Sequence, residues 1–258
     1  EILLDFVKAP YFTEETVQKE QGIIGQEIRM YQDDPDWQVL FNLLRGLYKN
    51  NPVRIDIAGT VESIAEINAE LLYSCYRTFY NNSNMCLAVA GNVKAEDVIA
   101  IADKVLKEEE PVDFEQIVPE EPYSVATDYI EEKLGVEFPK FAIGFKEKCE
   151  SIVPSPKKTL LYELALEVIA GRFSPLYTKL LDEGLINTTF GKEYFYGRGF
   201  ASVLFSGESK QPEKVRDAIT DEITRIRNEG INSEDFDICL KKKYGAEILT
   251  LIDKIMNK

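Results

Sequence analysis

Two glutamates on one predicted helix are the residues of this sequence whose types and spacing could do chemistry. Glu20 and Glu27 are seven positions apart in the stretch EETVQKEQGIIGQEIRM, residues 14–30. An amphipathic helix is indicated there by apolar residues at roughly helical spacing, namely Val17, Ile23, Ile24 and Ile28. Seven residues make nearly two turns, so both carboxylates are expected on one face. The pair is either a polar edge in solvent or a metal ligand supported by a second carboxylate. The helix alone favours the polar edge, because glutamate is common on helices.

The helix that would position this pair is expected to begin after Thr13, which can cap it, and to end near Gln32. The remainder of the first half is predicted to be helical, apart from an extended stretch with a bend at Gly59 and one short buried strand. In chain order the predicted elements are a helix at Trp37–Tyr48, the extended stretch at 52–60, a helix at Glu62–Tyr80 capped by Thr60, a strand at Met85–Ala90 and a helix at Lys94–Lys107.

The second half follows a linker at residues 108–124, which holds three prolines and many acids. Its pattern predicts the order β-β-α-β-β-α-α, with a hairpin around the sequence Gly197-Arg198-Gly199. The predicted elements are strands at Ser124–Glu131 and Glu137–Phe145, a helix at Lys157–Glu183, hairpin strands at Asn187–Phe195 and Phe200–Ser206, and helices at Pro212–Asn228 and Ser233–Met256. The first half is similar to the closing part of the same kind of unit, without an opening hairpin and first helix.

Composition limits the class of protein. The 258 residues suit two domains, and 45% hydrophobic with 29% charged residues is ordinary for a soluble globular protein. The formal net charge of −15 disfavours nucleic acid and anionic membranes as partners, and no apolar run is long enough to span a bilayer. The first residue is Glu rather than Met, so a targeting segment before it is left open.

Histidine and cysteine content restrict the chemistry further. The chain has no histidine, which removes every mechanism that needs an imidazole from this chain alone. The four cysteines form no C-x-x-C pair and are expected to be buried free thiols, which suits a reducing compartment and predicts a cytoplasmic protein: Cys75, Cys86, Cys149 and Cys239.

Several strings in order resemble the insulinase-like (pitrilysin-type) zinc metallopeptidases, and more narrowly a bacterial cytosolic branch of that family. They are PYFTEETVQKEQGIIGQEIRM at 10–30, DDPDWQ at 33–38, NPVRIDIAGTVESI at 51–64 and YRTFYNNSNMCLAVAGNV at 76–93. The second half fits more loosely, through AGRFSPLYTKLLDEGLI at 170–186.

The resemblance implies roles for the two glutamates. In that family an H-x-x-E-H helix supplies two zinc ligands and a general base, and a later helix carries Glu, six residues, Glu. Carried over, Glu27 would be the third zinc ligand and Glu20 its support from the outer shell. This chain has no H-x-x-E-H motif, so it contains no catalytic residue of its own and is expected to lack zinc or to bind it weakly. Zn²⁺ is expected in the full-length parent protein.

The resemblance also implies the fold and the substrate. It predicts an α+β (two-layer α/β) fold with two related domains of the zinc-peptidase clamshell type, each an antiparallel-rich sheet packed by helices on one face. Residues 1–110 would be the incomplete zinc-binding domain, truncated at its N-terminus, and residues 111–258 a second, non-catalytic domain. Many relatives hold the peptide with an Arg and a Tyr near positions 181–188, which this chain lacks. The nearby candidates for peptide contact are Arg172, Tyr194, Tyr196 and Arg198.

Three interpretations remain open. The chain is a fragment of a zinc endopeptidase that cleaves peptides in an enclosed chamber, which the intact Glu20 and Glu27 favour. Alternatively, it belongs to a non-catalytic peptide-binding or scaffold subunit, which could hold an extended peptide along a sheet edge. In the third, both glutamates are surface acids and the resemblance reflects fold alone. The expected partners are a peptide substrate and a homologous peptidase-like chain or a second copy, because a missing hairpin and helix would leave apolar surface uncovered.

Overall fold

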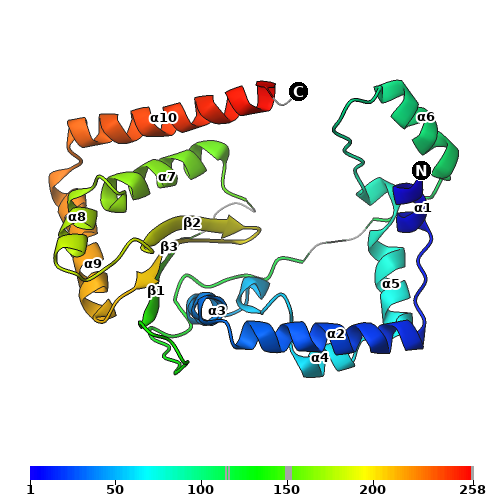
Figure 1. Cartoon of the computed structure of the whole chain (residues 1–258), viewed down its shortest axis with the longest axis horizontal. Helices are drawn as coiled ribbons and strands as arrows, with labels where there is room; N and C mark the ends of the chain where they lie inside the picture. Colours follow the sequence, from blue (N-terminus) through cyan, green and yellow to red (C-terminus); the bar gives the residue numbers. More distant parts are fainter. Residues whose placement is uncertain (114, 116, 149–152, 257–258) are drawn as a thin grey trace. The chain divides into compact units, whose positions relative to one another are not determined.

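The computed structural model describes residues 1–113, 115, 117–148 and 153–256 (Figure 1). Two compact units make up the chain, and neither is a single continuous segment. The first comprises Glu1–Met30 and Ile57–Ile117, and the second comprises Tyr31–Asp56 and Val118–Asn257. The described residues form an α+β fold that is mostly helical and has one small antiparallel sheet.

The first unit contains helices and irregular segments. Its elements are α1 (Ile2–Lys8), most of α2 (Glu14–Gln32), α4 (Val61–Ala65), α5 (Ala69–Phe79), the short 3-10 helix η2 (Asn82–Asn84) and α6 (Ala95–Val105). The helix predicted around the two glutamates is confirmed as α2. Thr60 caps α4 as predicted, in a reciprocal pair with Ser63.

Two predictions in this unit are wrong. The single helix predicted at Glu62–Tyr80 is two helices, because the side chain of Asn68 accepts the N–H of Leu71 and starts α5 as a new helix. The run Met85–Ala90 forms no strand. A strand exists only when a neighbouring backbone completes its hydrogen-bond ladder, and no described residue pairs with this run.

The second unit contains the sheet. Its elements are α3 (Pro35–Leu47), the 3-10 helix η1 (Pro52–Arg54), β1 (Lys140–Lys146), α7 (Pro156–Ala170), α8 (Pro175–Asp182), β2 (Gly191–Gly197), β3 (Phe200–Glu208), α9 (Pro212–Glu229) and α10 (Ser233–Met256). The strand order is β1-β3-β2, and both pairings are antiparallel. The predicted hairpin is confirmed as β2–β3, and Gly199 in its turn has φ +75°, a conformation that favours glycine.

Helices cover both faces of this sheet, and side-chain alternation along β3 explains why. Ala201 and Phe205 belong to a hydrophobic cluster with residues of α7, α8 and α9. Leu204 points to the opposite face and packs with Phe41 and Leu44 of α3. The expectation of helices on one face only is therefore wrong for this sheet, since its central strand is apolar on both faces.

The second half also departs from the predicted elements in two places. The helix predicted at Lys157–Glu183 breaks after Gly171, and Ser174 caps α8 with Pro175 at its first position. The stretch Ser124–Glu131 forms no strand, and of Glu137–Phe145 only the part in β1 does. The described residues thus show one β-strand before α7 rather than two.

The described residues contain one sheet, so the antiparallel sheet expected in the first half is not among them. The cysteines also differ from expectation. Cys75, Cys86 and Cys239 are free, but only Cys239 is buried, because α5 and the run around Cys86 are uncovered; Cys149 lies outside the described residues.

Candidate functional site

Helix α2 presents Glu20 and Glu27 to solvent. Its first turn is closed by a reciprocal pair, in which the N–H of Thr16 donates to Thr13 Oγ1 (3.1 Å) and the N–H of Thr13 donates to Thr16 Oγ1 (3.0 Å). Val17 is buried, whereas both glutamates are exposed. Seven helical residues rise about 10 Å. The two carboxylates therefore share one face of the helix, nearly two turns apart.

Gln21 orients α2 within the first unit. Its side-chain amide donates to the carbonyl oxygens of Ile64 in α4 (3.1 Å) and of Ile67 just after α4 (2.7 Å). The carboxylate of Glu14 accepts the N–H of Ala69 at the start of α5 (3.3 Å). These contacts hold the Gln21 side of the helix against α4 and α5. The buried residues Val17 and Ile28 lie on the same side, and the two glutamates lie beside them.

The metal donors of this chain do not by themselves fit a zinc centre. Zinc in proteins takes three or four protein ligands, usually with imidazole or thiolate among them. The chain has no histidine, and the described residues contain no group of three or more Cys, Asp or Glu side chains that could hold a metal ion. Glu27 supplies one carboxylate and Glu20 a second that is two turns away, so no step through zinc follows from this chain alone.

Of the four residues predicted to contact peptide, the structure brings Tyr194 and Tyr196 together on one face of β2, with ring centroids 5.1 Å apart. Tyr194 is buried, stacks on Tyr162 of α7 (4.2 Å between centroids) and donates its hydroxyl to Glu147 Oε2 (2.7 Å). Its ring and hydroxyl are engaged inside the molecule. Tyr196 is 40% exposed and is the better placed of the two to meet a ligand.

Glu147 is the centre of a charged cluster next to Tyr194. Lys158 of α7 forms an ion pair with it, and Tyr194 donates to it. Burial raises the pKa of the Glu147 carboxyl, but hydrogen bonds from Lys158, Tyr194 and Tyr162 outweigh burial and hold the pKa below its ordinary value. The carboxylate is therefore ionised at neutral pH and holds α7 to the sheet.

The two arginines are exposed and lie outside β2, the strand that carries the tyrosine pair. Arg172 is in the connection between α7 and α8, and Arg198 is in the turn of the β2–β3 hairpin. The carbonyl oxygen of Arg198 accepts from the Asn51 side chain (3.4 Å), which fixes the turn and leaves the guanidinium exposed.

A groove of about 630 Å³ lies beside β2. Tyr196 is the one lining residue that the sequence predicts as a peptide contact. Its walls come from α7, α10, the segment before α7 and β2: Val153, Pro154, Pro156, Thr159, Leu160, Glu163, Tyr196, Lys243 and Glu247. Lys243 forms ion pairs with Glu163 (2.7 Å) and Glu247 (3.4 Å), and the hydrogen bond that it donates to Glu163 raises the pKa of Lys243 above its ordinary value. The lining is mainly apolar, and its one lysine is paired with two carboxylates.

β2 is an edge strand of the sheet. Its one partner among the described strands is β3, so its outer edge carries backbone N–H and C=O groups that another strand can meet. The groove opens on the same strand, at Tyr196. An edge next to an apolar groove can hold an extended peptide, with backbone pairing for affinity and a side-chain pocket for selection.

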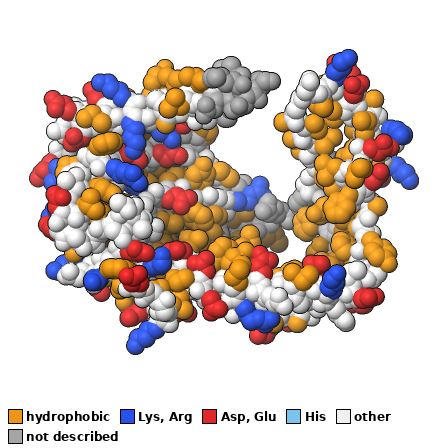
Figure 2. All heavy atoms as spheres, in the orientation of Figure 1, with side chains coloured by type: hydrophobic (Ala, Val, Ile, Leu, Met, Phe, Trp, Pro, Cys, Tyr) orange, Lys and Arg blue, Asp and Glu red, His pale blue; other side chains and the backbone are white. Residues whose placement is uncertain are grey.

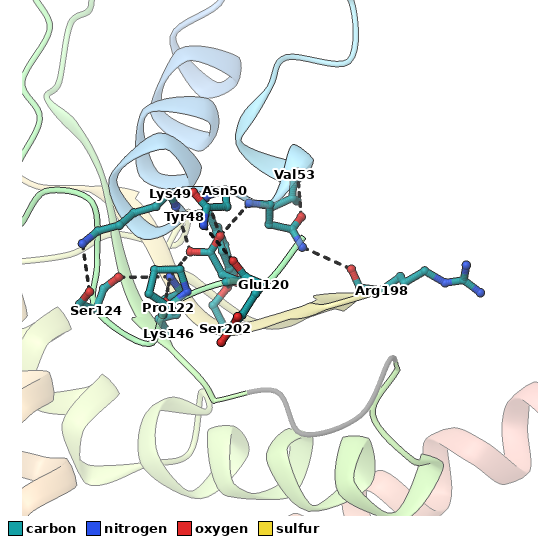
Figure 3. Close-up of polar contacts among 12 residues, drawn as sticks. Tyr48, Lys49, Asn50, Val53, Glu120, Pro122, Ser124, Lys146, Arg198 and Ser202 are labelled. Carbon is teal, nitrogen blue, oxygen red and sulfur yellow. Dashed lines mark hydrogen bonds and ion pairs between the residues drawn. The ribbon is translucent and has the colours of Figure 1, made fainter. Parts of the chain in front are cut away.

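A buried ion pair fixes the end of α3 to this sheet (Figure 3). Glu121 binds Lys146 of β1 and accepts backbone N–H groups from Lys49 (2.9 Å), Asn50 (2.7 Å) and Asn51 (2.7 Å). Burial raises the pKa of Glu121, but these hydrogen bonds, Lys146 first, lower it to about 2. Sequence reasoning missed this contact because Glu121 lies in a stretch of acids and prolines that is typical of a linker.

Comparison with known proteins assigns the family. Residues 66–243 match the family model described as the Peptidase M16 inactive domain. This chain belongs to the M16 peptidase family. The predicted resemblance to pitrilysin- and insulinase-like peptidases is thereby confirmed. The match contains Arg172, Tyr194, Tyr196 and Arg198, whereas α2 with its two glutamates precedes it.

Individual M16 relatives agree with this assignment. The chain is 40% identical to the uncharacterized zinc protease YmfH of Bacillus subtilis over 260 residues, which cover 97% of this chain and 60% of YmfH. A crystal structure of an M16-like peptidase from Alicyclobacillus acidocaldarius is 35% identical, with a TM-score of 0.88, and covers 96% of this chain and 60% of that one. The structure of pitrilysin shares the fold at 17% identity, with a TM-score of 0.65, over 91% of this chain and 26% of pitrilysin.

The chain spans about 60% of the length of the first two relatives. It shares the fold of the Alicyclobacillus structure over nearly all of its own length. No helix in the described ranges is both long and apolar enough to cross a membrane.

Proposed function

We propose that this chain is part of a cytoplasmic zinc-dependent endopeptidase, to which it contributes one zinc-ligating carboxylate and a peptide-holding surface. Glu27 would bind the zinc, and Glu20 would support it from the outer shell. The observation that carries the proposal is that α2 exposes both carboxylates on one face, at the spacing the family uses. The imidazole ligands and the general base would come from an H-x-x-E-H helix outside these 258 residues.

In this proposal residues 1–110 are the incomplete zinc-binding domain, and residues 111–258 are a second, non-catalytic domain of related architecture. The second domain would hold an extended peptide along the outer edge of β2. Tyr196 and the adjoining groove would accept a side chain of the peptide, with Arg198 at the end of the strand. Tyr194 would act indirectly, by fixing β2 to α7 through Glu147.

The experiment that tests the zinc role uses the full-length parent protein. Glu27→Gln is expected to lower both zinc content and peptide hydrolysis, because a neutral amide is a poor zinc ligand. Glu15→Gln is the matched control, since Glu15 is also exposed on α2 but lies outside the pair. Zinc content and hydrolysis unchanged by Glu27→Gln would refute the role and leave both glutamates as surface acids.

A second candidate function is a non-catalytic peptide-binding or scaffold subunit, and the match of residues 66–243 to an inactive-domain model favours it. Both functions use the edge of β2. They differ in the protein encoded before Glu1: an H-x-x-E-H motif there favours the peptidase, and its absence favours the scaffold. Binding of an extended peptide without cleavage, by full-length protein loaded with zinc, would also favour the scaffold.

A further inference from the structure

The groove beside β2 combines apolar walls with more carboxylates than ammonium groups. Its apolar lining residues are Val153, Pro154, Pro156, Leu160 and Tyr196. Its charged lining residues among those described are Glu163 of α7 and the pair Lys243 and Glu247 of α10, a helix that packs beside α7 (Figure 1). This lining formally carries two negative charges and one positive charge. It suits an occupant that is apolar along its length and cationic at its tip.

Glu247 is the carboxylate of this lining that a second cation can best approach. The ammonium of Lys243 lies 2.7 Å from Glu163 Oε2 but 3.4 Å from Glu247 Oε1. The Glu247 side chain is 62% exposed, compared with 41% for Glu163. A carboxylate can accept several hydrogen bonds, and the longer contact with Lys243 uses little of that capacity. Lys243 therefore mainly neutralises Glu163, and Glu247 can accept a further donor.

Two other lysines on the elements that form the groove are held by a different carboxylate. Lys192 of β2 and Lys242 of α10 both bind Glu167, at 2.7 Å and 2.6 Å, and neither is among the described lining residues. The chain as a whole has 45 acidic and 30 basic residues, and Figure 2 shows acidic side chains on its surface. The charge of the groove and the net charge of the chain both favour a cationic occupant.

We propose that this groove holds an arginine or lysine side chain of an extended peptide paired with the outer edge of β2, and that Glu247 selects this side chain. The inference rests on the peptide-holding role proposed above for β2 and adds the class of peptide. Alternate side chains of a paired strand point to the face of the sheet that carries Tyr196. The aliphatic stem of a basic residue would lie against Leu160 and the two prolines, and its head would bind the Glu247 carboxylate.

The test measures how the full-length parent protein binds short peptides that each carry a single arginine, placed at a different position in each peptide. Every peptide has a partner with citrulline, which has the shape of arginine without its charge. In the register that brings arginine to the groove, we expect binding about fivefold tighter than with citrulline, the upper range for an exposed ion pair. Glu247→Gln should remove this preference and leave the affinity for the citrulline peptide unchanged. Fluorescence anisotropy gives the dissociation constants.

Two further variants separate selection by Glu247 from a general effect of charge. Lys243→Met should increase the preference for arginine, because it removes the ammonium that competes for Glu247 and keeps the apolar stem. Glu234→Gln is the matched control on α10, since Glu234 is exposed and outside the lining, and it should leave the preference unchanged. A preference that survives Glu247→Gln, or one that falls in Lys243→Met, would overturn the proposal.

The measurement is made in the Glu27→Gln background, which the proposed zinc role expects to bind peptide without cleaving it. Hydrolysis that persists in this background would contradict the zinc role alone, and the preference for arginine would then be read as a ratio of kcat/KM values. The absence of any register that prefers arginine to citrulline would overturn the present inference alone. Polypeptide outside these 258 residues that fills the groove would produce that second result.

Discussion

Replacing Glu121 with glutamine is expected to destabilise the second unit by about 3.5 kcal/mol at neutral pH. The figure comes from the pKa of this carboxyl, which falls from an ordinary 4.5 to about 2, at about 1.4 kcal/mol per pKa unit. The side chains of Glu121 and Lys146 are only 7% and 3% exposed, so solvent screens the pair little. Removing one partner also leaves the other as a buried charge, which typically costs about 3–5 kcal/mol.

The sign of the pH dependence follows from the lowered pKa. Glu121 binds a proton less readily in the folded chain than in the unfolded chain, so its stabilisation is fully present above pH 4.5. That stabilisation is lost as the pH falls from 4.5 towards 2. The Glu121→Gln variant should lack this part of the acid sensitivity, since its amide does not titrate.

Urea unfolding followed by tryptophan fluorescence measures this effect. Trp37 is the single tryptophan, and it packs against Phe41 of α3 in the second unit (5.1 Å between ring centroids), so the signal reports that unit. The urea midpoint should fall without a change in slope. Glu120→Gln is the control, because Glu120 is exposed and precedes Glu121 in the chain.

Combining Glu121→Gln with Lys146→Met tests the reasoning more severely. If the cost of the single change is mainly the unpaired ammonium of Lys146, the double variant should be more stable than the two single losses would predict by addition. A Glu121→Gln loss no larger than that of Glu120→Gln, in a folded protein, would refute the ion-pair argument. Additive losses in the double variant would refute it as well.

Three further predictions follow from the described residues. Tyr194→Phe should lower the free energy of unfolding in urea by about 1.5–3 kcal/mol, because the partly buried Glu147 carboxylate loses a hydroxyl donor. A decrease no larger than that caused by substituting an exposed residue would contradict the importance of this hydrogen bond. Gly199→Ala should destabilise more than Gly230→Ala, since both glycines have positive φ but only at Gly199 would the new Cβ meet a neighbour, 2.4 Å from Val118 Cγ1; equal losses in thermal unfolding would count against this packing. The 258-residue chain alone should hold no zinc after dialysis and hydrolyse no peptide, and chelator-sensitive hydrolysis by pure material would contradict the incomplete donor set.

Much of the fold could be predicted from local sequence signals. The helix α2, the β2–β3 hairpin and the last two helices were located because caps, a Gly-Arg-Gly turn and apolar periodicity are properties of neighbouring residues. The wrong helix predictions occur where one residue ends a helix inside a longer run of apolar residues at helical spacing. Asn68 and Gly171 each interrupt a run that is apolar at helical spacing on both sides, and periodicity alone does not reveal such a break.

The candidate site was predictable only in part, because its contacts join distant residues. The shared face of Glu20 and Glu27 follows from helical geometry. The engagement of Tyr194 with Glu147 and Tyr162 could not be foreseen, since these residues are 47 and 32 positions from it in the chain. Membership of the M16 family does not reveal these contacts, which come from the structure.

The two units differ in how many hydrophobic side chains they bury. Both hydrophobic clusters among the described residues lie in the second unit, whereas in the first unit Val17 and Ile28 are the buried hydrophobic side chains. The second unit can therefore fold on its own core, but the first exposes the faces that a core would use. Glu20 and Glu27 lie on a helix of that uncovered unit. Zinc in proteins takes three or four protein ligands, and the described residues contain no group of three or more Cys, Asp or Glu side chains that could hold a metal ion. The proposed zinc role of Glu27 therefore depends on ligands from outside these 258 residues.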